Sequence, residues 1–114
     1  MLKNKGKMIG VQVTITRLTD ETQPGWVECR LTDINGKDWT FVEKAPMVSK
    51  PPLDAKSSYP QQGVIACELF LTWLDITGRD VVTIDTSIPW GVKSTNGKTQ
   101  FDVFASQLTR LEAK

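Results

Sequence analysis

The clearest pattern in the sequence is a two-residue alternation of apolar and polar side chains, which is typical of half-buried β-strands. After Met8, isoleucine and valine occupy every second position as far as Ile15, with mainly polar residues between them. In the next stretch, Val27, Cys29 and Leu31 lie on the face that the alternation predicts to be buried. The alternation and the flanking turn signals predict strands at residues 8–17, 26–32, 38–43, 64–74, 80–86, 90–95 and 99–104.

Residues 64–74 differ from the other predicted strands because they are apolar on both faces apart from Glu68. An unbroken apolar run predicts a central strand that is covered by protein on both sides. A buried helix is the alternative, because periodicity alone does not separate the two structures for a short apolar run.

Turn-forming pairs divide these strands. Asn35-Gly36, Thr77-Gly78 and Asn96-Gly97 each supply a glycine for a tight turn that requires positive φ. Residues 33–38 resemble residues 75–80, since both read Asp-Ile, a polar residue, glycine, a cation and aspartate. The resemblance indicates either a duplicated hairpin or two hairpins with the same turn chemistry.

Two segments lack the strand pattern. Residues 44–62 contain four prolines and show no period, so they predict a long loop, either a crossover between strands or a functional loop. After Ala105 the sequence predicts a short helix, with Leu108 and Leu111 on one side.

These elements predict an all-β fold: a small antiparallel barrel or sandwich of six to seven strands, with at most one short helix, at the C-terminal end. A length of 114 residues suits one such domain. We expect residues 1–7 to form a disordered basic tail and residues 8–114 to form a single β-rich domain. The tail is not followed by the continuous apolar stretch of a signal peptide, and residues 63–74 are too short to span a membrane, so we expect a cytoplasmic protein.

The net charge and the residue types that the sequence lacks exclude several kinds of functional site. The net charge of +1 is weak for a protein that binds nucleic acid mainly by electrostatics. The chain has no histidine, which removes the usual catalytic triads and proton shuttles, and two cysteines are too few for a tetrahedral zinc site. Gly97-Lys98-Thr99 matches the last three residues of a phosphate-binding loop, but the glycine before them has the wrong spacing for that motif. We therefore expect no enzymatic activity, no metal and no cofactor.

Two cysteines and one glutamate occupy predicted strands at positions where burial would change their chemistry. Cys29 and Cys67 lie on predicted inward faces, where a free cysteine packs as a small hydrophobe. Glu68 interrupts an apolar strand, and a buried carboxylate would have a perturbed pKa that marks a functional site. The alternatives for Glu68 are a solvent-facing position or an ion pair with Arg30 or Arg79.

Lys37, Arg79 and Lys98 each follow a turn glycine, so they would form a basic rim if the three turns met at one end of a barrel. With tryptophans available to stack on bases, such a rim predicts an OB-like or SH3-like nucleic-acid-binding barrel. The opposing interpretation is that the cations solvate the turns, that tryptophans fill the core, and that nearby aspartates cancel the charge.

Exposed aromatic residues are a second type of candidate site. Trp90 stands between Pro89 and Gly91, and with Tyr59 and the proline-rich loop it would form an aromatic patch. Trp26 and Trp39 are further candidates, because aromatic residues are enriched at protein interfaces. The alternative is that Trp90 closes one end of the barrel.

Three stretches resemble a group of small, uncharacterised bacterial all-β proteins. They are residues 24–29 (PGWVEC), 63–68 (GVIACE) and 89–92 (PWGV). The resemblance spans most of the chain and implies a bacterial cytosolic protein, but it implies no activity and no functional residue.

The leading hypothesis is therefore a non-enzymatic cytosolic protein-binding module, such as an immunity-type or accessory protein that covers a partner's surface. The second hypothesis is the nucleic-acid-binding barrel. The third is a small-ligand-binding barrel with the 44–62 loop as its lid. The sequence indicates neither the partner nor the oligomeric state.

Overall fold

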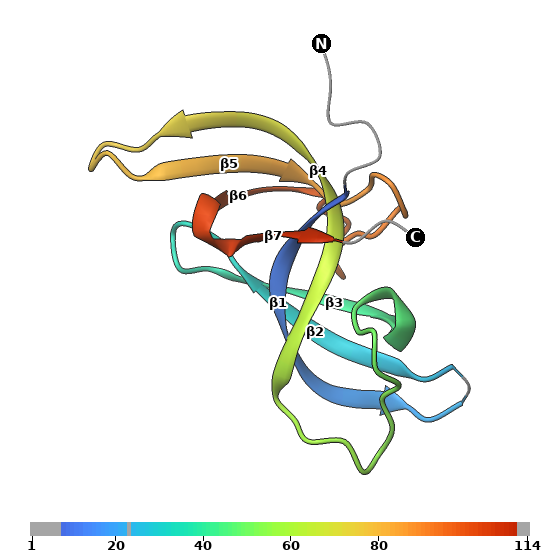
Figure 1. The fold of residues 1–114 in the computed structure, drawn as a ribbon. Helices are drawn as coiled ribbons and strands as arrows, with labels where there is room; N and C mark the ends of the chain where they lie inside the picture. Colours follow the sequence, from blue (N-terminus) through green and yellow to red (C-terminus); the bar gives the residue numbers. More distant parts are fainter. Residues whose placement is uncertain (1–7, 23, 112–114) are drawn as a thin grey trace.

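A computed structural model describes residues 8–22 and 24–111, and its strands are labelled in Figure 1. Within those residues the chain forms seven β-strands and two short 3-10 turns, which confirms the predicted all-β fold. In chain order the elements are β1 (Met8–Asp20), β2 (Trp26–Thr32), β3 (Asp38–Lys44), η1 (Ala45–Met47), β4 (Gln61–Leu74), β5 (Asp80–Asp85), β6 (Gln100–Phe104), η2 (Ala105–Gln107) and β7 (Leu108–Leu111). The predicted basic tail lies outside the described residues.

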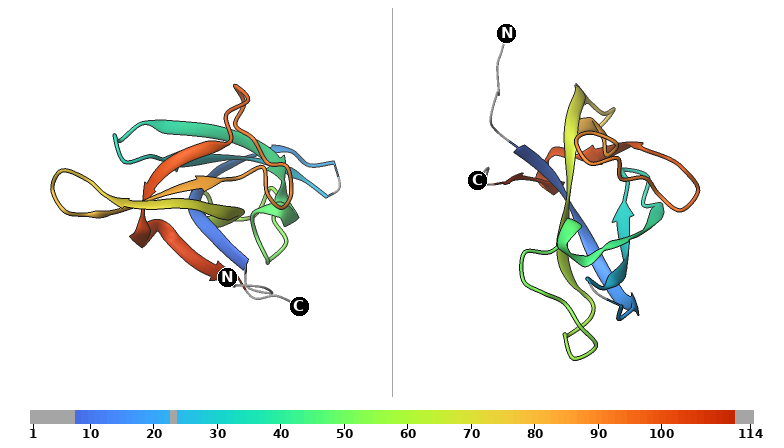
Figure 2. Two further views of the ribbon diagram at one scale, coloured as in Figure 1. Left: turned by 90° about the horizontal axis from the view of Figure 1, so that it is seen from above. Right: turned by 90° about the vertical axis from the view of Figure 1, so that its right-hand side faces the viewer.

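The strands form one curled antiparallel sheet, a half-barrel (Figure 2). Hydrogen-bonded neighbours follow the order β3-β2-β1-β4-β5-β6, and β7 also pairs with β1. β1 pairs with β4 through residues 9–15, with β2 through residues 14–20 and with β7 through residues 8–11. β4 occupies one edge of β1. The other edge of β1 is shared by β2 and β7, and β7 continues the sheet where β2 ends.

The core lies on the inner side of this curl. Alternate residues of β2 are fully buried there, at the positions that the sequence pattern predicts. Phe41 of β3 and Phe101 of β6 are also buried, with ring centroids 5.6 Å apart. The N–H of Ile34 donates to the carbonyl of Asp102 at 3.0 Å. These contacts bring the β3 and β6 ends of the sheet together.

β4 does not lie in the core over its whole length, and this corrects the prediction of a strand covered on both sides. The residues from Ile65 to Cys67 are buried beside β1. Every residue from Glu68 to Leu74 is exposed, because this half pairs with β5 alone among the described strands and extends beyond the rest of the sheet (Figure 1). The apolar run therefore leaves the core at Glu68.

Two further predictions are wrong in detail. Residues 90–95 form no strand, and the segment after β5 is instead held by the buried Thr86, whose hydroxyl donates to the carbonyl of Val92 at 2.7 Å. The segment after Ala105 is not a helix but one 3-10 turn followed by β7. Leu108–Leu111 take the strand conformation because β1 offers them an open edge.

Gly63 allows the proline-rich loop to pass close to β4. The N–H of the next residue, Val64, donates to the carbonyl of Val48 at 3.0 Å. A Cβ atom on Gly63 would lie 2.8 Å from that carbonyl oxygen and 2.7 Å from Cδ1 of Ile15. Both distances are shorter than normal van der Waals contacts, so a side chain at this position forces the loop away from the strand.

Gly63→Ala is expected to lower the free energy of unfolding by about 1–3 kcal/mol, the usual cost of overpacking. Urea unfolding followed by circular dichroism measures this difference. Adding Ile15→Val removes the contact with Cδ1, so the double variant should lose less stability than the sum of the two single variants, whereas the contacts with Ile15 Cγ1 and with the Val48 carbonyl oxygen, both at 2.8 Å, remain. A single variant as stable as the natural protein would contradict the close approach.

Candidate functional site

Three tight turns share one hydrogen-bond pattern. In each, the N–H of the first residue donates to the carbonyl of the fifth, and the N–H of the fourth residue donates back to the carbonyl of the first. The fourth residue is always glycine with φ between 78° and 88°, a conformation in which a side chain would be strained. The turns span residues 33–37, 75–79 and 94–98. The cations at their fifth positions are Lys37, Arg79 and Lys98.

The side chain of the first residue stabilises each turn. Asp33 Oδ1 accepts hydrogen bonds from the backbone N–H groups of the third and fifth residues, at 2.9 and 3.0 Å. Asp75 Oδ1 does the same at 2.9 Å, and Ser94 Oγ accepts the N–H of the fifth residue at 3.0 Å. The sequence resemblance between the first two turns is therefore a resemblance of geometry. Because the third turn has the same geometry, shared turn chemistry explains it without a duplication.

Each turn places its cation against an aromatic ring. Lys37 Nζ lies 4.4 Å from the ring centroid of Trp39, and Lys98 Nζ lies 5.1 Å from the same centroid. The guanidinium carbon of Arg79 lies 4.2 Å from the centroid of Phe104. Such contacts contribute about 0.5–1 kcal/mol at exposed sites, because the ring face carries negative potential. Two cations of the predicted basic rim thus meet at one ring, and the third lies at another.

A pocket of about 430 Å³, which we call the Trp39 pocket, opens beside the Trp39 ring. Trp39 Nε1 donates to Asp33 Oδ2 at 2.9 Å. The ring also meets Phe101 edge-on, with centroids 5.7 Å apart and an interplanar angle of 65°. These two contacts fix the orientation of the indole. The pocket is lined by Asp33, Asn35, Lys37, Trp39, Thr83, Lys98, Gln100, Phe101 and Asp102.

Both carboxylates of the Trp39 pocket already accept hydrogen bonds. Partial burial alone would raise the pKa of Asp33, but hydrogen bonds from the Trp39 indole and from two backbone N–H groups outweigh it and lower that pKa. Asp102 Oδ1 accepts the Thr83 hydroxyl at 2.6 Å. The two lysines of the pocket form no ion pair with any residue that the structure describes.

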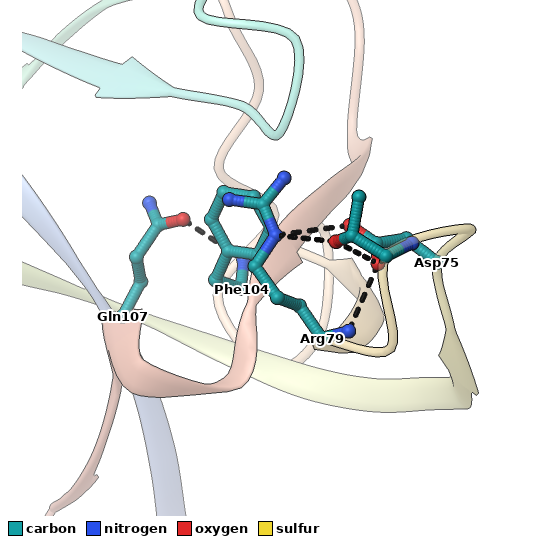
Figure 3. A network of polar contacts seen from close by, with 5 residues as sticks. Asp75, Arg79, Phe104 and Gln107 are labelled. Atoms are coloured by element: carbon teal, nitrogen blue, oxygen red, sulfur yellow. Dashed lines mark hydrogen bonds and ion pairs between the residues drawn. The ribbon is translucent and has the colours of Figure 1, made fainter.

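Arg79 is more firmly held than the two lysines. Figure 3 shows its side chain against Phe104, with Asp75 beside it. Arg79 Nε donates to Asp75 Oδ2 and to Thr77 Oγ1, both at 3.1 Å. The Thr77 hydroxyl and the backbone N–H of Arg79 donate to Asp75 and lower its pKa to about 2. Asp75 therefore stays ionised, and it neutralises the charge of Arg79. Gln107 accepts the N–H of Phe104 at 2.9 Å.

Phe104 and one wall of the Trp39 pocket lie on one outward face of the sheet, whereas Trp39 itself shares the face of the buried Phe41 on β3 and packs against the edge of the core. Thr83 of β5 lies opposite Asp102 of β6, and Phe104 is two residues further along, so it shares the face of Asp102. Trp73 of β4 lies on the same outward face, because its Nε1 donates at 3.3 Å to Oγ1 of Thr83, a residue that lines the Trp39 pocket. We call Trp39, Trp73 and Phe104 the aromatic strip.

The ends of β4 and β5 and the turn between them, residues 68–80, form what we call the apolar hairpin. It projects from the rest of the molecule in Figures 1 and 2. Phe70 is 62% exposed, Leu74 is 64% exposed, and Ile76 in the turn is fully exposed. The exposed large hydrophobic residues are concentrated here rather than scattered. They are Leu69, Phe70, Leu71, Trp73, Leu74 and Ile76.

The other aromatic candidates lie apart from the Trp39 pocket. Trp90 lines a groove of about 600 Å³ together with residues 46–51 of the proline-rich loop and with β7. Tyr59 packs against the core, and its hydroxyl donates to a carbonyl of the same loop at 2.9 Å. Trp26 is half-buried on β2, with Lys44 Nζ 5.8 Å from its ring centroid. The structure therefore does not gather the predicted aromatic residues into one patch.

Glu68 lies exposed on β4, opposite Asp85. It faces solvent and is not buried, in agreement with the first of the two alternatives that the sequence left for this residue. Cys29 and Cys67 are buried and free, which confirms their prediction as core residues.

The described part of the chain contains no group of three or more cysteine, aspartate and glutamate side chains placed to hold a metal ion. Nor do these residues include a helix with the length and apolar character needed to cross a membrane. No family model, curated protein or solved structure matches the chain.

Two features of the site are missing from the residues singled out by sequence: the apolar hairpin and the ring of Phe104. One sequence signal does point to the hairpin. The apolar run continues to Leu74, only four residues before the turn glycine Gly78, and Ile76 lies inside the turn itself. Turn positions are normally polar, so a continuous apolar run that extends almost into a turn indicates an exposed apolar tip.

Proposed function

We propose that this protein is a non-enzymatic protein-binding module and that its contact surface is the apolar hairpin. The observation that carries the proposal is the concentration of exposed apolar side chains on a hairpin that projects from the core. Such patches are unfavourable in a free protein, and they are typical of surfaces that bind another protein.

The chemistry of the hairpin suits a protein partner. Phe70 and Trp73 supply the aromatic anchors that commonly carry most of the energy of an interface. From Glu68 to Leu74, β4 pairs with β5, and its other edge has no partner among the described strands. The backbone N–H and C=O groups on that edge are open to pairing with a strand of the partner.

The sequence resemblance implies a bacterial cytosolic setting for this module. An immunity-type or accessory protein would there cover the surface of a second protein and block or stabilise it. The projecting hairpin supports this role, because a projecting apolar element reaches into a partner's cleft more readily than a flat surface does.

The test compares the natural protein with Phe70→Ser/Leu74→Ser/Ile76→Ser, in which three exposed apolar side chains of the hairpin are removed. A matched control removes three exposed apolar side chains elsewhere, by Val42→Ser/Ile88→Ser/Trp90→Ser. Tagged proteins are used for affinity capture from a nuclease-treated lysate of the source organism. The recovered partner is then purified and titrated against each protein by calorimetry.

The hairpin variant is expected to bind the partner at least about tenfold more weakly, and the control within about twofold of the natural protein. Equal binding by the hairpin variant would contradict the proposal. Loss of binding in the control instead would assign the interface to the groove beside Trp90. Sedimentation of each protein alone shows whether the partner is a second copy of the chain.

A further inference from the structure

We propose that the Trp39 pocket binds a nucleotide unit of a single-stranded nucleic acid, with the base on the Trp39 ring and the phosphate at Lys37 and Lys98. The residues of this pocket lie outside the apolar hairpin. The pocket can therefore be tested separately from the protein-binding proposal, and only Trp73 of the aromatic strip belongs to both surfaces.

The first step of the argument is the pair of lysines. Lys37 and Lys98 come from two different turns but converge on one ring, at 4.4 and 5.1 Å from its centroid. Neither forms an ion pair with a described carboxylate. An ammonium group has three N–H donors, and the contact of a solvent-exposed ammonium group with a ring is weak. Both side chains can therefore leave the Trp39 ring for phosphate oxygens, and this movement uncovers the ring face.

The second step is the charge balance of the pocket. Asp33 and Asp102 offset the two lysines, although both carboxylates already accept hydrogen bonds from neighbouring residues. A pocket with little net charge attracts a bare phosphate weakly. A ligand that also stacks a base on an aromatic ring gains the additional attraction that such a pocket lacks.

The third step is the pair of amides at the pocket wall. Asn35 and Gln100 both line the Trp39 pocket. Each amide side chain carries donors and an acceptor, as the edges of nucleobases do. The pocket thus combines an aromatic platform, groups that match a base edge and cations for a phosphate.

The aromatic strip favours a strand over a free nucleotide. Trp73 and Phe104 continue on the outward face from the Trp39 pocket, linked to it through Thr83 and Asp102. Successive aromatic rings on one face are the platform on which single-stranded nucleic acids stack their bases without strong sequence preference. Arg79 at Phe104 is neutralised by Asp75, so Lys37 and Lys98 remain the principal phosphate contacts.

The experiment measures binding of fluorescein-labelled oligothymidylate and oligouridylate, each about 15 nucleotides long, by fluorescence anisotropy. Sodium chloride is varied from about 50 to 300 mM. Two neutralised lysines predict a slope of log affinity against log salt of about −1.4. A parallel titration with the free mononucleotides UMP and TMP tests whether one nucleotide is sufficient.

The variant Lys37→Gln/Lys98→Gln removes the two phosphate contacts, and Lys50→Gln/Lys56→Gln removes the same charge from the exposed proline-rich loop. We expect the first variant to bind the oligonucleotides about tenfold more weakly with a nearly flat salt dependence. The second should stay within about twofold. All four lysines are exposed, so both variants should fold, and thermal unfolding checks this.

Binding of oligonucleotides alone, weakened only by the pocket variant, supports a strand as the ligand. Binding of mononucleotides with the same dependence on Lys37 and Lys98 supports the same chemistry with a free nucleotide as its source. The proposal is overturned if neither ligand binds, or if both lysine variants weaken binding equally. Retained binding in the hairpin variant Phe70→Ser/Leu74→Ser/Ile76→Ser separates this site from the protein interface.

Discussion

Phe41→Ala is expected to lower the free energy of unfolding by about 3–5 kcal/mol, the range for truncating a buried phenylalanine. The Phe41 side chain is fully buried, and its ring lies 5.6 Å from that of Phe101. The substitution therefore opens a cavity where β3 and β6 meet across the core. A small domain typically has a stability of about 5–15 kcal/mol, so the variant should be marginally folded.

Urea unfolding at equilibrium measures the loss, followed by tryptophan fluorescence and by circular dichroism to check for a single transition. Val42→Ala is the matched control, because Val42 is the next residue on β3 but is exposed. It should change stability by less than about 0.5 kcal/mol. If Phe41→Ala cost no more than this control, the contact between the two ends of the sheet would contribute little to the fold.

Raising the pH above 9 is expected to destabilise the protein through its two cysteines. Burial in the core, with smaller contributions from Glu43 and Glu28, raises the pKa of Cys29 from 9.0 to about 12. Burial and the charge of Asp85 raise the pKa of Cys67 to the same value. Above pH 9 the unfolded chain has lost thiol protons that the folded protein still holds. The folded state then binds more protons, and its stability falls as pH rises, by up to about 1.4 kcal/mol per pH unit for each thiol.

Between about pH 8 and pH 10 the two thiols together should reduce the free energy of unfolding by about 2–3 kcal/mol. Urea unfolding under reducing conditions at both pH values gives this difference. Other groups also titrate in this range, so the matched comparison is Cys29→Ala/Cys67→Ala, in which only the thiol contribution is absent. A variant with the same pH dependence as the natural protein would show that the thiols are accessible to hydroxide or remain buried in the unfolded state.

The strands with a clear two-residue period could be predicted from the sequence, and their ends follow from the turn glycines. β2 occupies the predicted residues, and Val27, Cys29 and Leu31 are buried as the pattern indicates. The apolar run of β4 does not by itself show which half is exposed, because an apolar run has the same pattern whether a second layer covers it or not. β7 was also inaccessible to local patterns, because Leu108–Leu111 form a strand through pairing with β1, far away in the sequence.

The candidate site, like the fold, could be predicted where it depends on local sequence and could not be predicted where it depends on contacts between distant residues. The glycine-cation pairs that mark the three turns could be found in the sequence, including Lys37 and Lys98. Their meeting at Trp39 depends on how the β3 and β6 ends of the sheet approach each other, and no local pattern reports this. Sequence comparison does not reveal that the turn at Ser94 has the same geometry as the turns at Asp33 and Asp75, because its first residue is serine and not aspartate. The serine nevertheless makes one of the same hydrogen bonds.

The pairing of β1 with three other strands has a consequence for the rate of folding. Its partners β4 and β7 lie about 50 and 100 residues further along the chain, so their contacts close long loops before they gain any stability. Sheets dominated by such distant pairings fold in milliseconds to seconds, much more slowly than helical bundles of similar size. During that interval the edges of β1 and the apolar end of β4 are open together. The nascent protein is therefore most exposed to misassembly, and to capture by chaperones, before β7 is in place.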